Sequence, residues 1–155
     1  KKDGIRHPTD VFTRVIELNL IASFNINTAA AQHMAKNEAN EAGERGVMIN
    51  TSSIAAFEGQ IGQVSYSAAK GGISAMTLTM ARDLGSLGIR CMTIAPSLFA
   101  TGLTARVTEE GAHNMTKDAA FPHRMGQPAE FATMAIAIFE SPMMNGSTLR
   151  VDGGQ

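Results

Sequence analysis

The sequence predicts an α/β protein in which helices cover both faces of a parallel sheet. Short apolar runs alternate with long stretches of helical periodicity, which is typical of consecutive βαβ units. Two of these runs are almost continuously apolar, as expected for strands that are buried on both faces. The length of 155 residues and the 44% hydrophobic content suit one folded unit. We therefore expect a doubly wound sheet with its site beyond the carboxyl ends of the strands.

The first half of the chain predicts a long helix, a buried strand and a second long helix. The HPTD motif indicates a helix start with Thr9 or Asp10 as the cap, and helical spacing of apolar residues continues to about Met34. The GVMINTSS run at residues 46–53 lies between a polar connection and a hydroxyl cluster, which indicates a buried strand. Residues 65–87 carry the second helical pattern, which ends at glycines.

The second half predicts another strand, a loop-rich segment, a helix and a short last strand. Residues 88–95 form an apolar run that Pro96 ends. Residues 97–127 mix apolar residues with turn formers and have no firm period. Residues 128–141 are helical in pattern, with a proline in the first turn, and the GSTLRVDGG run at 146–154 suits the last strand.

Composition argues against several classes of partner. The formal net charge is −1 and the basic residues are dispersed, so neither nucleic acid nor an anionic membrane is an expected partner. No apolar run reaches the ~18 residues that a spanning helix needs. The single cysteine, Cys91, lies in an apolar run and predicts a buried, inert thiol, and the four histidines lack metal-ligand spacing. We expect no metal.

One tyrosine, one lysine and one serine carry the strongest chemical signal. Tyr66 and Lys70 are four apart on a predicted helix, so both side chains project from one face. A nearby ammonium favours the phenolate form of a tyrosine, which makes the phenol a usable acid or base near neutral pH. Ser53 follows the predicted strand thirteen residues before Tyr66, and its hydroxyl suits a substrate oxygen, whereas Ser52 suits a strand-end hydrogen bond. Proton transfer at a carbinol oxygen uses these roles.

In these residues the chain resembles the short-chain dehydrogenase/reductase family over essentially its whole length. Three stretches carry the resemblance: NTSSIAAFEGQIGQVSYSAAKGG, MTLTMARDLGSLGIRCMTIAPSLFATGL and FPHRMGQPAE. The FEGQIGQ segment is most similar to the 3-hydroxyacyl-CoA dehydrogenases of that family. The resemblance implies a Rossmann-type fold and hydride transfer between a nicotinamide cofactor and a secondary alcohol or ketone.

The resemblance also implies a role for each catalytic residue. Ser53, Tyr66 and Lys70 match the family's catalytic serine, tyrosine and lysine. Asn19, on the first helix, matches the asparagine that supports a water-linked proton relay to the lysine. An asparagine that is satisfied by the backbone is the alternative for Asn19, because a buried amide must be bonded in either case.

The cofactor implied is NAD, with NADP as the alternative. By resemblance, Tyr66 and Lys70 contact the cofactor, Pro96 opens the motif beside the nicotinamide, and Thr101 bonds the carboxamide. A plain turn residue is the alternative for Thr101. Ser97 stands where the family usually has glycine, and we expect a modest effect on nicotinamide packing.

The substrate implied is a small molecule, a 3-hydroxyacyl-CoA or its 3-oxoacyl partner. Candidate substrate contacts are Ser53, Gln60, Gln63 and Phe99, with solvated loop amides as the alternative for the two glutamines. A 3-oxoacyl reductase that acts on an acyl carrier protein and a hydroxysteroid dehydrogenase are alternative activities. A further alternative is a non-catalytic fragment or an oligomerisation module built on the two long helices.

The glycine-rich phosphate loop of the family has no counterpart in residues 1–155. We therefore expect these residues to form a single partial domain, the carboxyl-terminal half of a doubly wound Rossmann domain. Roughly ninety to a hundred residues of the two-halved fold would be missing. The resemblance further implies a homodimer or homotetramer through the two long helices. We expect a cytoplasmic location, with the mitochondrial matrix as the alternative.

Overall fold

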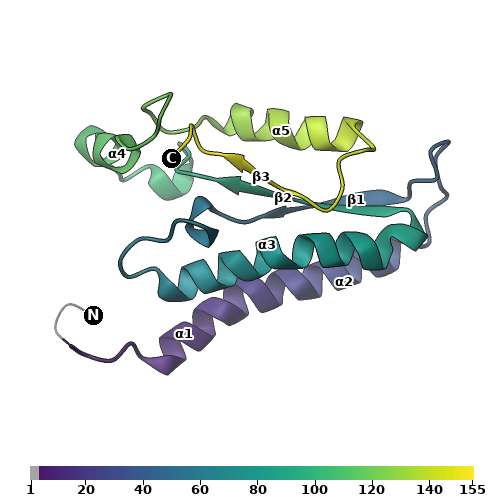
Figure 1. Cartoon of the computed structure of the whole chain (residues 1–155), viewed down its shortest axis with the longest axis horizontal. Helices are drawn as coiled ribbons and strands as arrows, with labels where there is room; N and C mark the ends of the chain where they lie inside the picture. The colour runs from purple at the N-terminus through teal and green to yellow at the C-terminus, as the bar shows by residue number, and fades with distance from the viewer. Residues whose placement is uncertain (1–3) are drawn as a thin grey trace.

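The computed structural model describes residues 4–155 as one parallel sheet between two helical layers (Figure 1). The strands are β1 (Gly46–Thr51), β2 (Ile89–Pro96) and β3 (Thr148–Val151), in the order β1-β2-β3. The helices are α1 (Thr9–Ile16), α2 (Ala22–Met34), α3 (Val64–Leu84), α4 (Glu109–Thr116) and α5 (Pro128–Glu140). Helices α2 and α3 cover one face of the sheet, with α1 packed against α3, and α5 covers the other face, so the predicted α/β class is confirmed.

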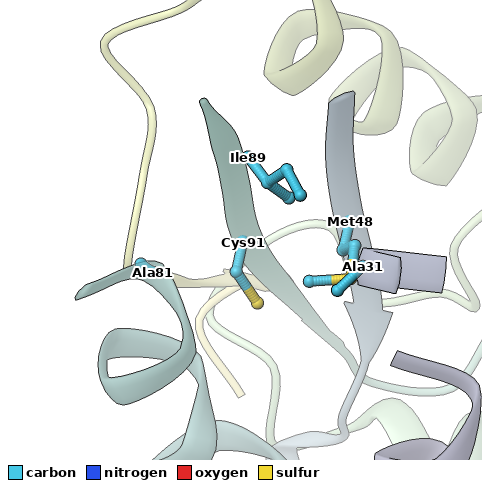
Figure 2. Packing of buried hydrophobic residues seen from close by; sticks show 5 residues of the cluster. All are labelled: Ala31, Met48, Ala81, Ile89 and Cys91. Carbon is cyan, nitrogen blue, oxygen red and sulfur yellow. The ribbon is translucent and has the colours of Figure 1, made fainter. Parts of the chain in front are cut away.

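The central strand is buried on both faces, as its apolar sequence predicts. Ile89 and Cys91 join Met48 in a cluster that packs against α2 and α3, and Figure 2 shows five side chains of this cluster. Met92 and Ile94 point to the other face and pack against α5. This alternation follows from the two-residue period of a strand, and it fixes which side chains reach each helical layer.

Cys91 is a buried thiol, as the sequence predicts. Its sulfur accepts a hydrogen bond of 3.6 Å from Nδ2 of Asn50, whose amide oxygen accepts one of 2.7 Å from Asn27. Burial raises the pKa of the Cys91 thiol, although the bond from Asn50 acts in the opposite direction. A thiol with a raised pKa is a poor nucleophile, so Cys91 has a packing role.

The first long helix runs from Thr9 to Met34 but is interrupted by a π-helical segment, Glu17–Ile21. Its cap differs from the prediction. Pro8 is the residue before the first turn, its carbonyl accepts from the amide of Phe12 at 3.2 Å, and no side chain caps the helix. The expectation that Thr9 or Asp10 is the cap is wrong, because the helix begins at Thr9 itself.

The loop-rich segment 97–127 contains two short helices that periodicity did not reveal. A 3₁₀ helix spans Gly102–Thr104, and α4 is capped by Thr108, whose hydroxyl accepts from the amide of Gly111 at 3.1 Å. Helix α4 has only eight residues, and they are mostly polar. So short a helix carries too few apolar positions to show a 3.6-residue period.

Candidate active site

The predicted site residues gather at the carboxyl end of the sheet. The turn after β1 carries Ser53, and α3 begins at Val64, so Tyr66 lies in its first turn. Residues after β2 continue past Pro96 along the same edge. Figure 1 shows the beginning of α3, the ends of β2 and β3, and helix α4 at one end of the molecule. This edge is where open α/β sheets bind ligands.

The two serines after β1 have different partners. Ser52 is buried; its hydroxyl donates to the Lys70 carbonyl at 2.8 Å and accepts from the hydroxyl of Ser74 at 2.9 Å. Ser53 is half-buried, and its Oγ accepts from the amide of Ala55 at 3.2 Å. An accepting hydroxyl keeps its own hydrogen for another partner. Ser52 is therefore a strand-end hydrogen-bonder, and Ser53 presents a usable hydroxyl to the site.

Tyr66 and Lys70 lie together on one face of α3. The Lys70 ammonium is 5.7 Å from the centroid of the Tyr66 ring, within the range of a cation–π contact. Its Nζ donates to the carbonyl of Thr51 at 3.0 Å, so the last residue of β1 holds the amine in place. Burial lowers the pKa of Lys70, because the low-dielectric surroundings penalise the ammonium. Two further ammonium hydrogens stay available for a hydroxyl-bearing ligand.

Asn19 lies in the π-helical segment, half-buried beneath α3. Its Nδ2 donates to the carbonyl of Val15 at 3.0 Å, and its own carbonyl accepts from the hydroxyl of Ser23 at 2.6 Å. No hydrogen bond joins Asn19 to Lys70 in the part of the chain that the structure describes. The proton relay stays a prediction; the π-helical segment that bears Asn19 packs next to α3, and π-helical turns are common at functional sites.

Two cavities meet at Tyr66. Cavity A has a volume of about 420 Å³, and Ser53, Glu58, Gln60 and Gln63 are among its lining residues. Cavity B has a volume of about 490 Å³ and a mostly apolar wall. Three residues line both cavities: Tyr66, Ser97 and Leu98. Tyr66 therefore lies where two cavities adjoin, as expected for a residue that exchanges a proton with one bound molecule while a second molecule is bound beside it.

The predicted substrate contacts divide between these cavities. Gln63 accepts a hydrogen bond of 2.9 Å from the amide of Gln60 through its side-chain oxygen, which orients the amide nitrogen as a donor. Phe99 lines cavity B and not cavity A, so it is separated from the other predicted substrate residues. Its ring meets Phe131 edge to face at 6.2 Å, and it fills the space that a side chain at Gly126 would need.

Lys70 lines neither cavity A nor cavity B, but the other three predicted cofactor contacts line cavity B. Pro96 and Thr101 lie on its wall with Thr51 and Tyr66. Thr101 also starts the 3₁₀ helix, where its amide donates to the Thr104 hydroxyl at 2.9 Å, so the turn role and the binding role are compatible. Ser97 has a negative φ and its amide donates to the Val151 carbonyl at 3.2 Å, so serine at this position causes no backbone strain.

Sequence reasoning missed three residues that shape cavity A. Glu58, Gln155 and Arg150 form one polar cluster, and the first two line the cavity directly. A signal for Glu58 was present, because it is the one charged residue in the stretch from Ser52 to Ala69. Arg150 lies 92 positions further along the chain, so no local pattern could have linked it to Glu58.

Among residues 4–155, no group of three or more histidine, cysteine, aspartate or glutamate side chains is arranged to hold a metal ion. No helix in this range is both long enough and apolar enough to cross a membrane.

The fold and the Ser53–Tyr66–Lys70 arrangement define a class, and comparison with known proteins agrees. The sequence model of a family described as enoyl-(acyl carrier protein) reductase matches residues 1–155. The chain belongs to the short-chain dehydrogenase/reductase family.

Five similar relatives, which are 46% to 50% identical to this chain, share one name. The human 3-hydroxyacyl-CoA dehydrogenase type-2 is 49% identical over 152 residues, which are 98% of this chain and 58% of the human protein. The Drosophila melanogaster protein of the same name is 46% identical and covers 97% of this chain. A crystal structure of 3-hydroxyacyl-CoA dehydrogenase type-2 from Mycobacterium avium superposes with a TM-score of 0.95 and 40% identity, over 100% of this chain and 60% of that one. The chain thus spans about three fifths of the length of these relatives.

Proposed function

We propose that this chain is the catalytic part of a nicotinamide-dependent oxidoreductase that interconverts a secondary alcohol and a ketone. The observation that carries the proposal is the position of Tyr66, which lines both cavity A and cavity B. Lys70 is fixed beside it by the Thr51 carbonyl, and Ser53 opens into cavity A. Two cavities allow two molecules to meet at one proton donor, which is what a redox reaction of a carbinol requires.

The three side chains have distinct tasks in the proposed reaction. Tyr66 gives a proton to the ketone oxygen in reduction and removes it from the alcohol in oxidation. The Lys70 ammonium stabilises the phenolate that forms when the proton leaves. Ser53 donates a hydrogen bond to the same substrate oxygen, which orients the carbonyl carbon and offsets the charge that develops on its oxygen.

Cavity B suits the nicotinamide end of a cofactor. Its wall offers the apolar groups Pro96 and Phe131 for a flat ring, and Thr101 supplies a hydroxyl for a carboxamide. Lys70 has free donors for ribose hydroxyls. A nicotinamide bound there supplies or accepts the hydride. NAD is the cofactor we propose, with NADP as the alternative.

For the substrate we propose a 3-hydroxyacyl-CoA or 3-oxoacyl-CoA. Five mammalian and insect relatives are named 3-hydroxyacyl-CoA dehydrogenase type-2, and they are 46% to 50% identical to this chain. Cavity A is open and bears amide donors, including Gln63, which suit the carbonyl groups of a thioester. A structure titled 3-oxoacyl-[acyl-carrier protein] reductase, from Brucella melitensis, is 34% identical with a TM-score of 0.83, so an acyl-carrier substrate is the alternative.

We also propose that residues 1–155 form the carboxyl-terminal part of one longer domain. In the part of the chain that the structure describes, β1 pairs only with β2, so its other edge is open for a further strand. Exposed strand edges are normally paired or covered. The intact mass of the natural protein tests this: a mass roughly ten kilodaltons above 16.4 kDa fits the rest of a two-halved fold, and a mass of 16.4 kDa overturns the proposal.

Self-association through the long helices is a further part of the proposal. Large apolar side chains on α1, α2 and the π-helical segment are exposed, including Leu18 at 61% and Ile26 at 70%. Apolar area of this kind usually marks an interface. Sedimentation analysis of the full-length protein should give a dimer or tetramer, and a monomer at micromolar concentration would contradict it.

The activity test uses the full-length natural protein with acetoacetyl-CoA and NADH. We expect NADH absorbance to fall with saturable kinetics and to recover when the 3-hydroxy product is supplied with NAD. Parallel assays with NADPH, an acetoacetyl acyl carrier protein and a hydroxysteroid decide cofactor and substrate class. An absence of turnover with all of them, together with no NADH binding by fluorescence, would favour the non-catalytic alternative.

A further inference from the structure

A charged cluster around Arg150 adjoins cavity A, and two residues that Arg150 contacts, Glu58 and Gln155, line this cavity. Arg150, on β3, donates to the carboxylate of Glu58, to the carboxylate of Asp152 at 2.6 Å and to the backbone carbonyl of Gln155. Its guanidinium also lies 5.8 Å from the ring centroid of Phe57. The bonds to Glu58 and Asp152 raise the pKa of Arg150, so the guanidinium stays charged at every working pH.

The cluster joins three segments that surround the cavity. Glu58 belongs to the turn that follows Ser53, and Gln155 lies beyond β3; both line cavity A. The side chain of Gln155 donates to the carbonyl of Met115 at 2.8 Å, and Met115, on α4, lines the same cavity. Arg150 is the one cation that contacts both Glu58 and the segment bearing Gln155 in the part of the chain that the structure describes.

Stability alone gives little reason for this cluster. The Arg150 and Glu58 side chains are 36% and 49% exposed, and ion pairs at that exposure add little to folding. The position of the pair at cavity A is more important than its contribution to stability, because a ligand in that cavity would be close to its charges. Glu58 places a carboxylate on the wall of a cavity, where it would repel an anionic substrate unless a cation compensates for it. The charges of Arg150, Glu58 and Asp152 sum to −1, and the excess negative charge belongs to Asp152, which does not line cavity A.

We propose that Arg150 is a specificity-determining residue, which neutralises Glu58 so that cavity A can accept the polyanionic coenzyme A end of an acyl-CoA. This inference rests on the proposed function for its substrate. Arg150 does not touch the reacting atoms. It acts by pairing with the Glu58 carboxylate and by donating to the Gln155 carbonyl, and both of these residues line cavity A. Its removal should weaken binding of an anionic substrate and leave the chemical step at Tyr66 nearly unaffected.

The proposal predicts an order of affinities from charge alone. Arg150→Gln leaves Glu58 and Asp152, a cluster charge of −2, and should raise the KM for acetoacetyl-CoA about three- to tenfold. Glu58→Gln leaves a charge of 0 and should not raise that KM. The double variant, with both substitutions, returns the charge to −1 and should restore a KM near the wild-type value. All differences should shrink as ionic strength rises.

The experiment measures kcat and KM of the full-length protein with two substrates that share one reacting group. Acetoacetyl-CoA carries the anionic end, and the acetoacetyl thioester of N-acetylcysteamine is neutral. We expect the KM order to appear only with acetoacetyl-CoA, and the KM for the neutral thioester to change less than about twofold. Arg82→Gln is the matched control, because it removes one positive charge from an exposed position on the second half of α3, far from cavity A.

Two results would overturn the proposal. Equal increases of KM in both single variants, without recovery in the double variant, would mean that the pair is a scaffold and that charge is irrelevant. An unchanged KM in Arg150→Gln would mean that this wall does not meet the substrate. If the wild-type protein turns over neither substrate, the proposed function fails by itself. Calorimetric titration with acetoacetyl-CoA then decides the inference through the same order in Kd, or its absence.

Discussion

At the two ends of the parallel sheet, positively charged side chains differ in how many of their hydrogen-bond donors are used within the protein. At the amino end of β2, Arg90 is buried and uses five hydrogen bonds, two to the carboxylate of Glu44 and three to the carbonyls of Ile138, Phe139 and Met144. At the carboxyl end, Lys70 has one acceptor within the protein, the carbonyl of Thr51. The guanidinium is fully used in holding the end of α5, whereas the ammonium keeps donors that can bind a ligand.

The number of unused hydrogen-bond donors distinguishes Arg90, a structural charge, from Lys70, the charge with a proposed function, better than burial does. Arg90 joins the sheet to the last turn of α5, where carbonyl groups lack helical partners, so its role is complete within the chain. Ser53, Tyr66 and Lys70 have incomplete hydrogen bonding; Ser53 and Tyr66 line cavities, and Lys70 lies beside Tyr66. Unused hydrogen-bonding capacity beside a cavity is what indicates the site, and the predictions that follow test this view.

The largest effect should follow removal of the Tyr66 hydroxyl. Tyr66→Phe keeps the ring beside Lys70 but removes the proton donor, so we expect kcat to fall about 10²- to 10⁴-fold. The thermal unfolding temperature should stay close to that of the wild type. Steady-state kinetics and calorimetry of the full-length protein measure both quantities, and retention of more than a tenth of kcat would refute the assigned role.

At the opposite end, Arg90→Met should affect stability and not chemistry. The change leaves the Glu44 carboxylate and three carbonyls without their donor, so we expect a loss of about 3–5 kcal/mol in the free energy of unfolding. Urea denaturation measures this loss. The kcat of the folded fraction should remain near wild type, and a specific loss of kcat would mean that the two ends are coupled.

The adjacent residues Ser52 and Ser53 allow the same comparison between a structural and a functional side chain. Ser52→Ala removes buried hydrogen bonds to Lys70 and Ser74 and should cost about 1–3 kcal/mol of stability. Ser53→Ala loses only the bond from Ala55, so stability should change little, while kcat/KM should fall about 10- to 100-fold through loss of a donor to the substrate oxygen. Equal stability losses in the two variants would remove the distinction.

The pH dependence of ketone reduction should report Lys70. Burial lowers the pKa of Lys70 below 10.5, so the ammonium is lost, and kcat/KM falls, at a lower pH than an exposed lysine would give. The effect on stability has the opposite direction. Because the pKa of Lys70 is lower in the folded state than in the unfolded state, the free energy of unfolding increases as the pH rises through the folded pKa toward the unfolded one. Lys70→Arg, which stays charged, should move the alkaline limb of kcat/KM upward; an unmoved limb would assign it to another group.

The smallest effect concerns an exposed pair at the beginning of α5. The hydrogen bond from Arg124, and then that from the Gln127 amide, lower the pKa of Glu130 to about 2. A lowered folded pKa adds stability above the unfolded value, and this contribution is lost as the pH falls toward 2. Arg124→Gln should raise the Glu130 pKa toward 4.5 in an NMR titration, and an unchanged value would mean that the amide of Gln127 is sufficient.

Sequence alone determined the order of the main elements and predicted the catalytic set. Strand and helix periods are local properties, so β1, α3, β2 and α5 could be placed within about a residue at their beginnings. The Ser53, Tyr66 and Lys70 set was readable because two members share a helix face and the third follows a strand. The distinction between Ser52 and Ser53 was also readable from spacing, and the hydrogen bonds of Ser52 agree with it.

Tertiary structure decided what depends on residues far apart in the sequence. The five bonds of Arg90 and the pairing of Arg150 with Glu58 span 46 to 92 positions, and no local pattern encodes such contacts. The division of the polar edge into two cavities, with Phe99 on the wall of one and Glu58 on the wall of the other, has the same origin. Local propensity fixes each element, but only packing of the elements fixes which side chains meet, because distances between elements are set by the whole core.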